Sequence, residues 1–428
     1  MTDDSSLASD RRRLLLGLAA TGTFAGGLAS AQEATPRANV AAAPPSTETA
    51  DRQPFYGRHQ AGVVTPRPAA GLVAAFEVIA ADPAELQRLF RTLTERGAFL
   101  TQGGAPPELD PRFPPADSGI LGPIVTPDNL TMTVSVGASL FDERYGLVDR
   151  KPVRLSRMTG FPNDALEAAR CHGDLSIQFC ANTPDTVIHA LRDVVKNLPD
   201  LLVLRWMQAG SVPVLPVVPG KPPESARNFL GFRDGSANPD SADVALMDRL
   251  VWVQPGQEEP DWASYGSYQV IRIIRNFVER WDRAPLREQE RFLGRDKASG
   301  APLSGGTEAD LPDYAADPEG KVTPLDSHIR LANPRTPETE KNLILRRPFN
   351  YSNGVTKSGQ LDMGLLFICY QSDLEQGFIT VQKRLDGEPL EEYLKPVGGG
   401  YFFTLPGATS AEDYLGRSLL EGSPQASG

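Results

Sequence analysis

Histidine is the residue in this sequence with the widest range of chemistry, and the chain contains four. His328 differs from the others because it lies in the segment LDSHIRLANPR, after a long polar tract and close to Arg330 and Arg335. A single histidine can bind haem iron at one axial position, and nearby arginines can pair with haem propionates. The sequence contains no HExxH motif and no close pair of cysteines, so it does not indicate a zinc site.

The other three histidines have simpler explanations. His189 lies within an amphipathic helical pattern, which indicates a structural role. His172 begins a strand pattern and has no partner pattern around it. His59 lies in the N-terminal segment FYGRHQAG, where we expect an exposed loop.

An acidic residue surrounded by glycines forms a second group. Asp234 lies in GFRDGSANPD at 231–240, flanked by Gly231 and Gly235. Glycines let the backbone approach a flat ligand closely. The dipeptides Asp-Gly and Asn-Pro are also common in turns, so the spacing alone favours a plain turn.

A pair of arginines forms a third group. Arg346 and Arg347 end the apolar run in NLILRRPFNYS at 342–352. Such a pair is either an exposed basic pair or the end of a strand from which one arginine points into a cavity.

The three cysteines are Cys171, Cys180 and Cys369, an odd number that leaves at least one unpaired in an exported protein. Cys180 and Cys369 lie in apolar runs, which predicts buried free thiols. A thiolate haem ligand is the alternative, but no surrounding motif supports it.

Length and charge limit the class of protein. The 428 residues are enough for about two or three domains. A net charge of −11 argues against a nucleic-acid-binding protein, which usually has a basic surface. Outside the N-terminus no stretch of 18 or more residues is apolar throughout, so we expect no integral membrane span.

The first 54 residues are typical of an export signal and a tether. Three arginines at 11–13 precede a weakly apolar segment, and Ala29-Ser30-Ala31 fits a cleavage site. This predicts a twin-arginine signal peptide at 1–31 and a periplasmic location, although Leu14 replaces the usual phenylalanine. An ordinary Sec signal is the alternative. Residues 32–54 are rich in Ala, Pro, Thr and Ser and predict a disordered tether.

The rest of the chain alternates strand and helix patterns in two halves. In the first half, 55–210, we expect strands at 71–80, 131–141, 174–182 and 201–210, and helices at 82–97 and 183–198. A Pro-rich linker at 211–225 follows. In the second half, 226–420, we expect strands at 268–277 and 360–370, helices at 281–295 and 373–385, and a tail at 421–428.

These patterns predict an α+β protein made of tandem ferredoxin-like domains, with antiparallel β-sheets and peripheral helices. The polar tract at 294–327 is longer than a compact domain usually contains. We expect it to act as a lid or to cover a cofactor.

Three segments together resemble the dye-decolorizing (DyP-type) haem peroxidase family, in particular its exported deferrochelatase/peroxidase branch. They are GFRDG at 231–235, SHIRLANPR at 327–335 and ILRRPFNYS at 344–352. FYGRHQAG at 55–62 and SGQLDMGLLFICYQ at 358–371 resemble that branch too, and the resemblance covers about 55–420.

The resemblance implies one haem b per chain and a fold of the dimeric α/β-barrel-like type. It assigns His328 as the iron ligand, Asp234 as the distal acid–base residue and Arg346 as the distal arginine. Arg347, next in the sequence, is the alternative to Arg346. Further haem contacts would come from Gly235, Ser236, Ala237, Asn333, Pro334 and Arg335.

The activity that the resemblance implies is reduction of hydrogen peroxide with oxidation of organic donors. Asp234 would move the peroxide proton, and Arg346 would stabilise the developing negative charge. One alternative is a deferrochelatase that releases iron from haem and leaves the porphyrin intact. Another is a non-enzymatic periplasmic haem-binding component, but such a protein needs neither Asp234 nor Arg346. A homodimer and partners from a periplasmic iron-uptake system are further expectations from the family.

Overall fold

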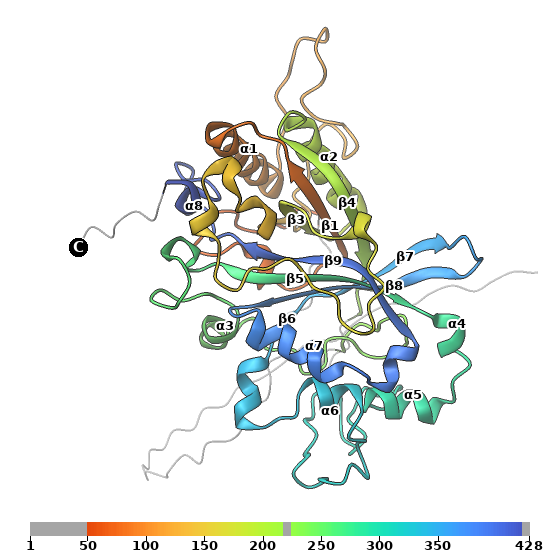
Figure 1. Ribbon diagram of the computed structural model, residues 1–428. Coiled ribbons are helices and arrows are strands. Elements are labelled where there is room, and N and C mark those ends of the chain that lie inside the picture. The colour runs from red at the N-terminus through yellow and green to blue at the C-terminus, as the bar shows by residue number, and fades with distance from the viewer. Residues whose placement is uncertain (1–48, 217–223, 422–428) are drawn as a thin grey trace, which may run out of the picture. The chain divides into compact units, whose positions relative to one another are not determined.

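The computed structural model describes residues 49–216 and 224–421 (Figure 1). The signal peptide predicted at 1–31, residues 32–48 of the tether, 217–223 of the linker and 422–428 of the tail lie outside those ranges. Residues 49–54 of the predicted tether pack against the first half. Arg52 Nε donates to the Gln102 carbonyl at 2.8 Å, and Gln53 Nε2 donates to Asn129 Oδ1 at 2.6 Å. The prediction of disorder is therefore wrong for these last six residues.

The first half has the predicted βαββαβ order. Its elements are β1 (Ala70–Val78), α1 (Pro83–Gln102), β2 (Thr131–Gly137), β3 (Leu175–Ala181), α2 (Pro184–Asn197) and β4 (Leu202–Ser211). The strands pair antiparallel in the order β4-β1-β3-β2. The first helix begins as its sequence indicates, because the Asp82 carboxylate accepts from the Glu85 amide at 2.9 Å and Pro83 occupies the first turn.

The second half repeats this arrangement. Its main elements are β5 (Ser267–Asn276), α4 (Val278–Trp281), α5 (Leu286–Leu293), β7 (Phe349–Val355), β8 (Leu361–Gln371), a π-helical turn (Glu375–Ile379), α7 (Thr380–Leu385) and β9 (Leu394–Thr404). The order β9-β5-β8-β7 matches that of the first half, strand for strand. The helix predicted at 281–295 corresponds to α5, which is shorter at both ends, and strands β7 and β9 were not predicted.

The strands of the two halves join into one sheet. β2 pairs with β9, for example Ser135 with Thr404, and β4 meets β7 at the pair Ser211 and Asn350. The complete order is β5-β9-β2-β3-β1-β4-β7-β8-β6, where β6 is Leu345–Arg346, and β5 also pairs with β8. The tandem ferredoxin-like, mainly antiparallel α+β fold is therefore confirmed.

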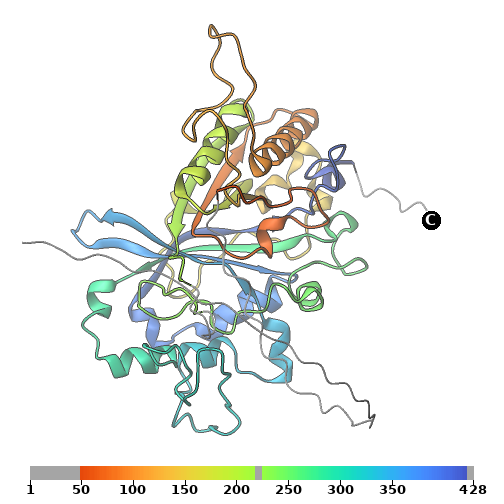
Figure 2. The ribbon, with the colours of Figure 1, turned by 180° about the vertical axis from the view of Figure 1, so that it is seen from behind.

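The helices lie outside the sheet, as expected (Figures 1 and 2). α1 and α2 pack beside the first-half strands, and the buried side chains between them form most of the largest apolar core. α6 (His328–Ala332) lies next to α5 and α7 in the second half. Two further helices are α3 (Val244–Leu250) and α8 (Arg417–Glu421). Within the described ranges, no helix has both the length and the apolar character that a membrane crossing requires.

Candidate active site

An ion pair joins the acidic loop at 231–240 to strand β6. Arg346 Nη1 lies 3.4 Å from Asp234 Oδ1, and Arg346 Nη2 donates to the Ser236 carbonyl at 3.0 Å. The Arg346 backbone is fixed by pairing with Cys369 of β8. Both charged side chains are half-buried, so the pair is shielded from solvent and retains more of its attraction than a surface pair.

Asn238 fastens this loop to the strand through the backbone of Arg346. Its amide nitrogen donates to the Arg346 carbonyl at 3.0 Å, and its amide oxygen accepts from the Arg346 N–H at 2.9 Å. Gly235 makes the turn possible, because its φ is +150° and a Cβ would lie 2.9 Å from Ser225 Oγ. The sequence indicates Asn238 only as part of an Asn-Pro turn and does not predict its contact with Arg346.

Arg347 points away from Asp234. Its guanidinium donates to the Thr65 carbonyl, to Thr65 Oγ1 at 3.4 Å and to the Pro66 carbonyl at 3.3 Å, and the residue is 4% exposed. Successive side chains of a strand point to opposite faces, which explains why the two neighbours separate. Of the two arginines, Arg346 is therefore the one that contacts Asp234.

His328, the first residue of α6, forms a second pair with Glu388. His328 Nδ1 lies 2.8 Å from Glu388 Oε2 and 3.0 Å from Glu388 Oε1. Burial alone would lower the pKa of His328, but the charge of Glu388 and its hydrogen bond raise the pKa above its usual value. Glu388 is buried and lies 60 residues further along the chain, in the turn after α7. No sequence pattern pointed to it.

The other ring nitrogen of His328, Nε2, has no hydrogen-bond partner among the described residues. The His328 side chain is 33% exposed, so its Nε2 atom remains accessible to a ligand. The charge of Arg346 lowers the pKa of His328, and the charge of Asp234 raises it. The histidine pair and the Asp234–Arg346 pair therefore lie within electrostatic range of each other.

Arginines gather in the same region. Burial lowers the pKa of Arg295, and the positive charges of Arg335 and Arg346 lower it further. Arg335 Nε is buried without a partner among the described residues. A buried cationic donor without a partner can be satisfied by an anion. The residues present thus fit haem, which offers an iron to a free imidazole nitrogen and two propionates to arginines.

The remaining predicted haem contacts occupy two strained turns. Ala237 and Arg335 have φ of +57° and +59°, a conformation that is uncommon outside glycine and concentrates at ligand sites. Ser236 Oγ donates to Glu308 Oε1 at 2.8 Å, and the Arg335 N–H donates to Asn333 Oδ1 at 3.0 Å. Pro334 lies between Asn333 and Arg335 in the sequence. Since Glu308 belongs to the tract at 294–327, that tract packs on the acidic loop.

The other histidines and the cysteines form no side-chain contact with Asp234, Arg346 or His328 among the described residues, although Cys369 is the strand partner of Arg346. His189 is buried and contacts Asp117 Oδ2 at 2.6 Å, so its structural role is confirmed. His59 was expected to be exposed, but its ring stacks on Trp252 with ring centroids 3.9 Å apart. All three cysteines are buried free thiols, as predicted.

The fold and the paired charges define an enzyme of the haem peroxidase class, and comparison with known proteins agrees. Residues 60–211 match the N-terminal domain, and residues 225–409 the C-terminal domain, of the family described as Dyp-type peroxidase. The chain therefore belongs to the Dyp-type peroxidase family.

Its relatives include deferrochelatases and solved peroxidase structures. The deferrochelatase of Shigella sonnei (strain Ss046) is 59% identical over 411 residues, which are 96% of each chain. That of Escherichia coli (strain K12) is 62% identical over 371 residues, 86% of this chain and 88% of the relative. Ferric DtpA from Streptomyces lividans is 34% identical with a TM-score of 0.77, covering 89% of this chain and 100% of DtpA. The DyP-type peroxidase from Cellulomonas bogoriensis is also 34% identical with a TM-score of 0.77, covering 87% of this chain and 99% of the other.

Proposed function

We propose that this protein is a peroxidase that binds one haem b per chain through His328. The observation that carries the proposal is the convergence of two charge pairs, His328–Glu388 and Asp234–Arg346, on one region of the second half. A protein that only carried haem would need the histidine but not the second pair. The proposed domains remain 55–210 and 226–420, with the haem in the latter.

On the histidine side, Glu388 accepts the Nδ1 proton and so leaves Nε2 free to bind iron. Bound haem iron would supply the electrons that cleave the peroxide O–O bond. Arg335 would pair with a propionate, and the backbone from Gly235 to Ala237 and from Asn333 to Pro334 would contact the macrocycle.

On the other side, the ionised Asp234 carboxylate accepts a proton from one peroxide oxygen and returns it to the other as water leaves. Arg346 orients this carboxylate and stabilises the negative charge that develops on the departing oxygen. One peroxide and two donor molecules, each giving one electron and one proton, yield two waters.

Haem loading tests the assignment of the ligand. The wild-type chain and His328→Ala are titrated with haem, and the Soret absorbance per protein is measured. We expect stoichiometric loading of the wild type and near-complete loss in the variant. A variant with an unchanged Soret ratio and an intact high-spin ferric spectrum contradicts the role of His328.

A second candidate is the release of iron from haem with the porphyrin intact. Identity of 58–62% to proteins named deferrochelatase favours this activity. Haem-loaded protein is incubated with an iron chelator, and free protoporphyrin is measured by its fluorescence. Fluorescence that persists in Arg346→Leu, while peroxide-dependent oxidation disappears, would assign iron release to a separate chemistry. A protein with neither activity would be a haem carrier.

We also propose export to the periplasm by the twin-arginine pathway, assembly as a homodimer and cooperation with iron-uptake components. The arginines at 11–13 support the first of these. Lysine replacements at 11–13 should abolish periplasmic, haem-loaded protein in cell fractions, and undiminished export excludes the pathway. Light scattering of the purified protein tests the dimer.

A further inference from the structure

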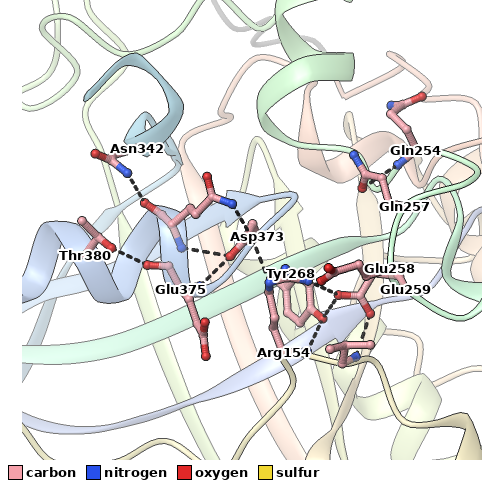
Figure 3. Close-up of polar contacts among 12 residues, drawn as sticks. Arg154, Gln254, Gln257, Glu258, Glu259, Tyr268, Asn342, Asp373, Glu375 and Thr380 are labelled. Carbon is pink, nitrogen blue, oxygen red and sulfur yellow. Dashed lines mark hydrogen bonds and ion pairs between the residues drawn. The ribbon is translucent and has the colours of Figure 1, made fainter. Parts of the chain in front are cut away.

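A cavity is lined by none of the residues that we propose to hold haem, and the proposed function does not use it. Its volume is about 470 Å³, and its walls come from the end of α3, the loop at 254–259, residues 341–343 and the end of β8. We call it the Arg154 pocket, because the Arg154 guanidinium lies in its wall between Glu259 and Asp373 (Figure 3). None of the predicted site residues lines it.

Two of the three acidic side chains that line the Arg154 pocket, Asp373 and Glu259, are already occupied, and the third, Glu258, is largely exposed and pairs with Arg154 at 2.9 Å. Asp373 accepts from the Glu375 and Gln376 amides and from Gln376 Nε2, each at 2.9 Å, and from Arg154 Nε at 2.8 Å. Glu259 accepts from the Val153 amide at 2.7 Å and from the Tyr268 hydroxyl at 2.5 Å. These carboxylates have little remaining capacity to accept a hydrogen bond from a ligand.

The basic groups, by contrast, keep unused donors. Arg154 has five N–H bonds, and three of them serve Glu258, Glu259 and Asp373. The Lys341 ammonium has no ion pair among the described residues. Arg249 contacts Glu340 at only 3.7 Å, with both side chains more than half exposed. The pocket therefore offers donors at its wall and its rim, and it favours a ligand that brings acceptors.

The apolar side chains and the position of the pocket restrict the class of ligand further. Leu250 and Leu343 line it and suit a ring or chain. Leu343 is three residues before Arg346, and Gln371, also in the lining, is two residues after the strand partner of Arg346, Cys369. The same two strands therefore connect the pocket to the arginine of the candidate active site.

We propose that the Arg154 pocket binds carboxylate-bearing organic electron donors, such as phenolic acids. This inference rests on the proposed peroxidase function and names its donor class. The donor carboxylate pairs with Lys341 and Arg249, and its ring packs on Leu250 and Leu343. Each phenol loses one electron and its hydroxyl proton to become a phenoxyl radical, and two such donors reduce one peroxide to two waters.

The test compares ferulate with its neutral methyl ester as donors for the haem-loaded protein. Arg249→Gln and Lys341→Gln are combined in one variant. The matched control, Arg287→Gln with Lys357→Gln, removes the same charge from exposed positions outside the pocket. In the pocket variant the ratio of KM for ferulate to KM for the ester should rise about fivefold at low salt, and in the control it should not.

Calorimetry of ferulate binding without peroxide gives a readout independent of turnover, and the pocket variant should bind more weakly by a similar factor. An unchanged ratio and unchanged binding, with normal peroxide turnover, overturn the pocket assignment alone. Equal changes in the control overturn it as well. If the wild type oxidises neither donor yet binds ferulate through Lys341 and Arg249, the peroxidase function fails and the binding site stands.

Discussion

The Arg346 guanidinium lies 3.4 Å from the Asp234 carboxylate, although 112 residues separate them in the sequence. Two separate constraints create this contact: β6 positions the arginine through β8, and Asn238 ties the acidic loop to the arginine backbone. The two charges are therefore oriented before any ligand binds. Such preorganisation costs no rearrangement during the reaction, which is how fixed charges become effective in catalysis.

Replacement of Arg346 by leucine should slow the reaction with peroxide. Loss of one donor to a developing negative charge typically costs ~3–4 kcal/mol, or about 10²–10³ in rate. The measurement is stopped-flow absorbance of haem-loaded protein mixed with peroxide. Asp234→Asn should also be slower, unless water carries the proton instead. If both variants react at the wild-type rate, the pair has no part in the chemistry.

Arg347→Leu has a different expected effect. From the sequence we would expect an exposed or neutral position, but the structure buries Arg347 and gives it three acceptors at Thr65 and Pro66. Leucine removes these partly buried hydrogen bonds to Thr65 and Pro66, at about 1–3 kcal/mol. The melting temperature should fall while the folded protein still reacts normally with peroxide. A normal melting temperature with a slow peroxide reaction would mean that Arg347 is the catalytic arginine.

Replacement of Glu388 by glutamine should weaken haem binding. The glutamine keeps the shape of the side chain but removes the charge next to His328 Nδ1. Loss of a partner that orients a metal ligand typically costs ~10–100-fold in affinity or activity. Haem affinity is measured by titration at the Soret band, with Glu391→Gln, in the following turn, as the control. Equal affinities for Glu388→Gln and the wild type would contradict the role of this carboxylate.

The sequence predicted most helices and strands because their periodic patterns are local, but it missed strands whose composition opposes strand formation. β9 contains a proline and three glycines, which are unfavourable in strands. Tertiary packing requires the glycines, because a Cβ at Gly399 would lie 1.9 Å from the Ile271 carbonyl of β5. β7 was missed for a similar reason, since half of it is exposed and polar.

The residues of the candidate site are likewise of two kinds, those that a local sequence pattern predicts and those that only the fold brings to the site. His328, Asp234 and Arg346 each belong to a short segment with a recognisable pattern, so the sequence identified them. Glu388 and Asn238 each act through two hydrogen bonds, across 60 and 108 residues, and no local pattern predicts these contacts. Only the fold brings these two residues to their partners.

Removal of one partner from a buried ion pair should be strongly destabilising. Arg272 in β5 is 1% exposed, and its guanidinium contacts both oxygens of the buried Asp164, with Nη1 to Oδ2 at 3.0 Å. Asp164→Asn leaves the guanidinium buried without a counter-charge, which typically costs ~3–5 kcal/mol. Urea denaturation measures the loss. Asp142→Asn removes the exposed one of the two carboxylates that pair with Arg144, the other being Asp174; this variant is the control and should cost about 1 kcal/mol or less.

His172 should make a contribution to stability that decreases below neutral pH. Burial and then the nearby charges of Arg157 and Arg205 lower the pKa of His172 to about 4. Above its ordinary pKa, near 6.5, the histidine is neutral in both the folded and the unfolded chain and has no effect. Between pH 6.5 and 4 only the unfolded chain binds a proton at His172. The free energy of the unfolded chain therefore falls, and the folded state becomes less stable relative to it.

The variant His172→Asn tests this contribution. Asparagine tolerates the left-handed φ of +62° at this position and does not titrate in this range. The free energy of unfolding, measured from pH 7 to pH 4.5, should therefore decrease less steeply in the variant than in the wild type, whatever the difference at pH 7. His189→Asn is not a suitable control because it breaks the buried contact with Asp117. Parallel pH curves for the wild type and His172→Asn would show that the His172 proton is not coupled to folding, and that Arg157 and Arg205 do not hold the imidazole neutral.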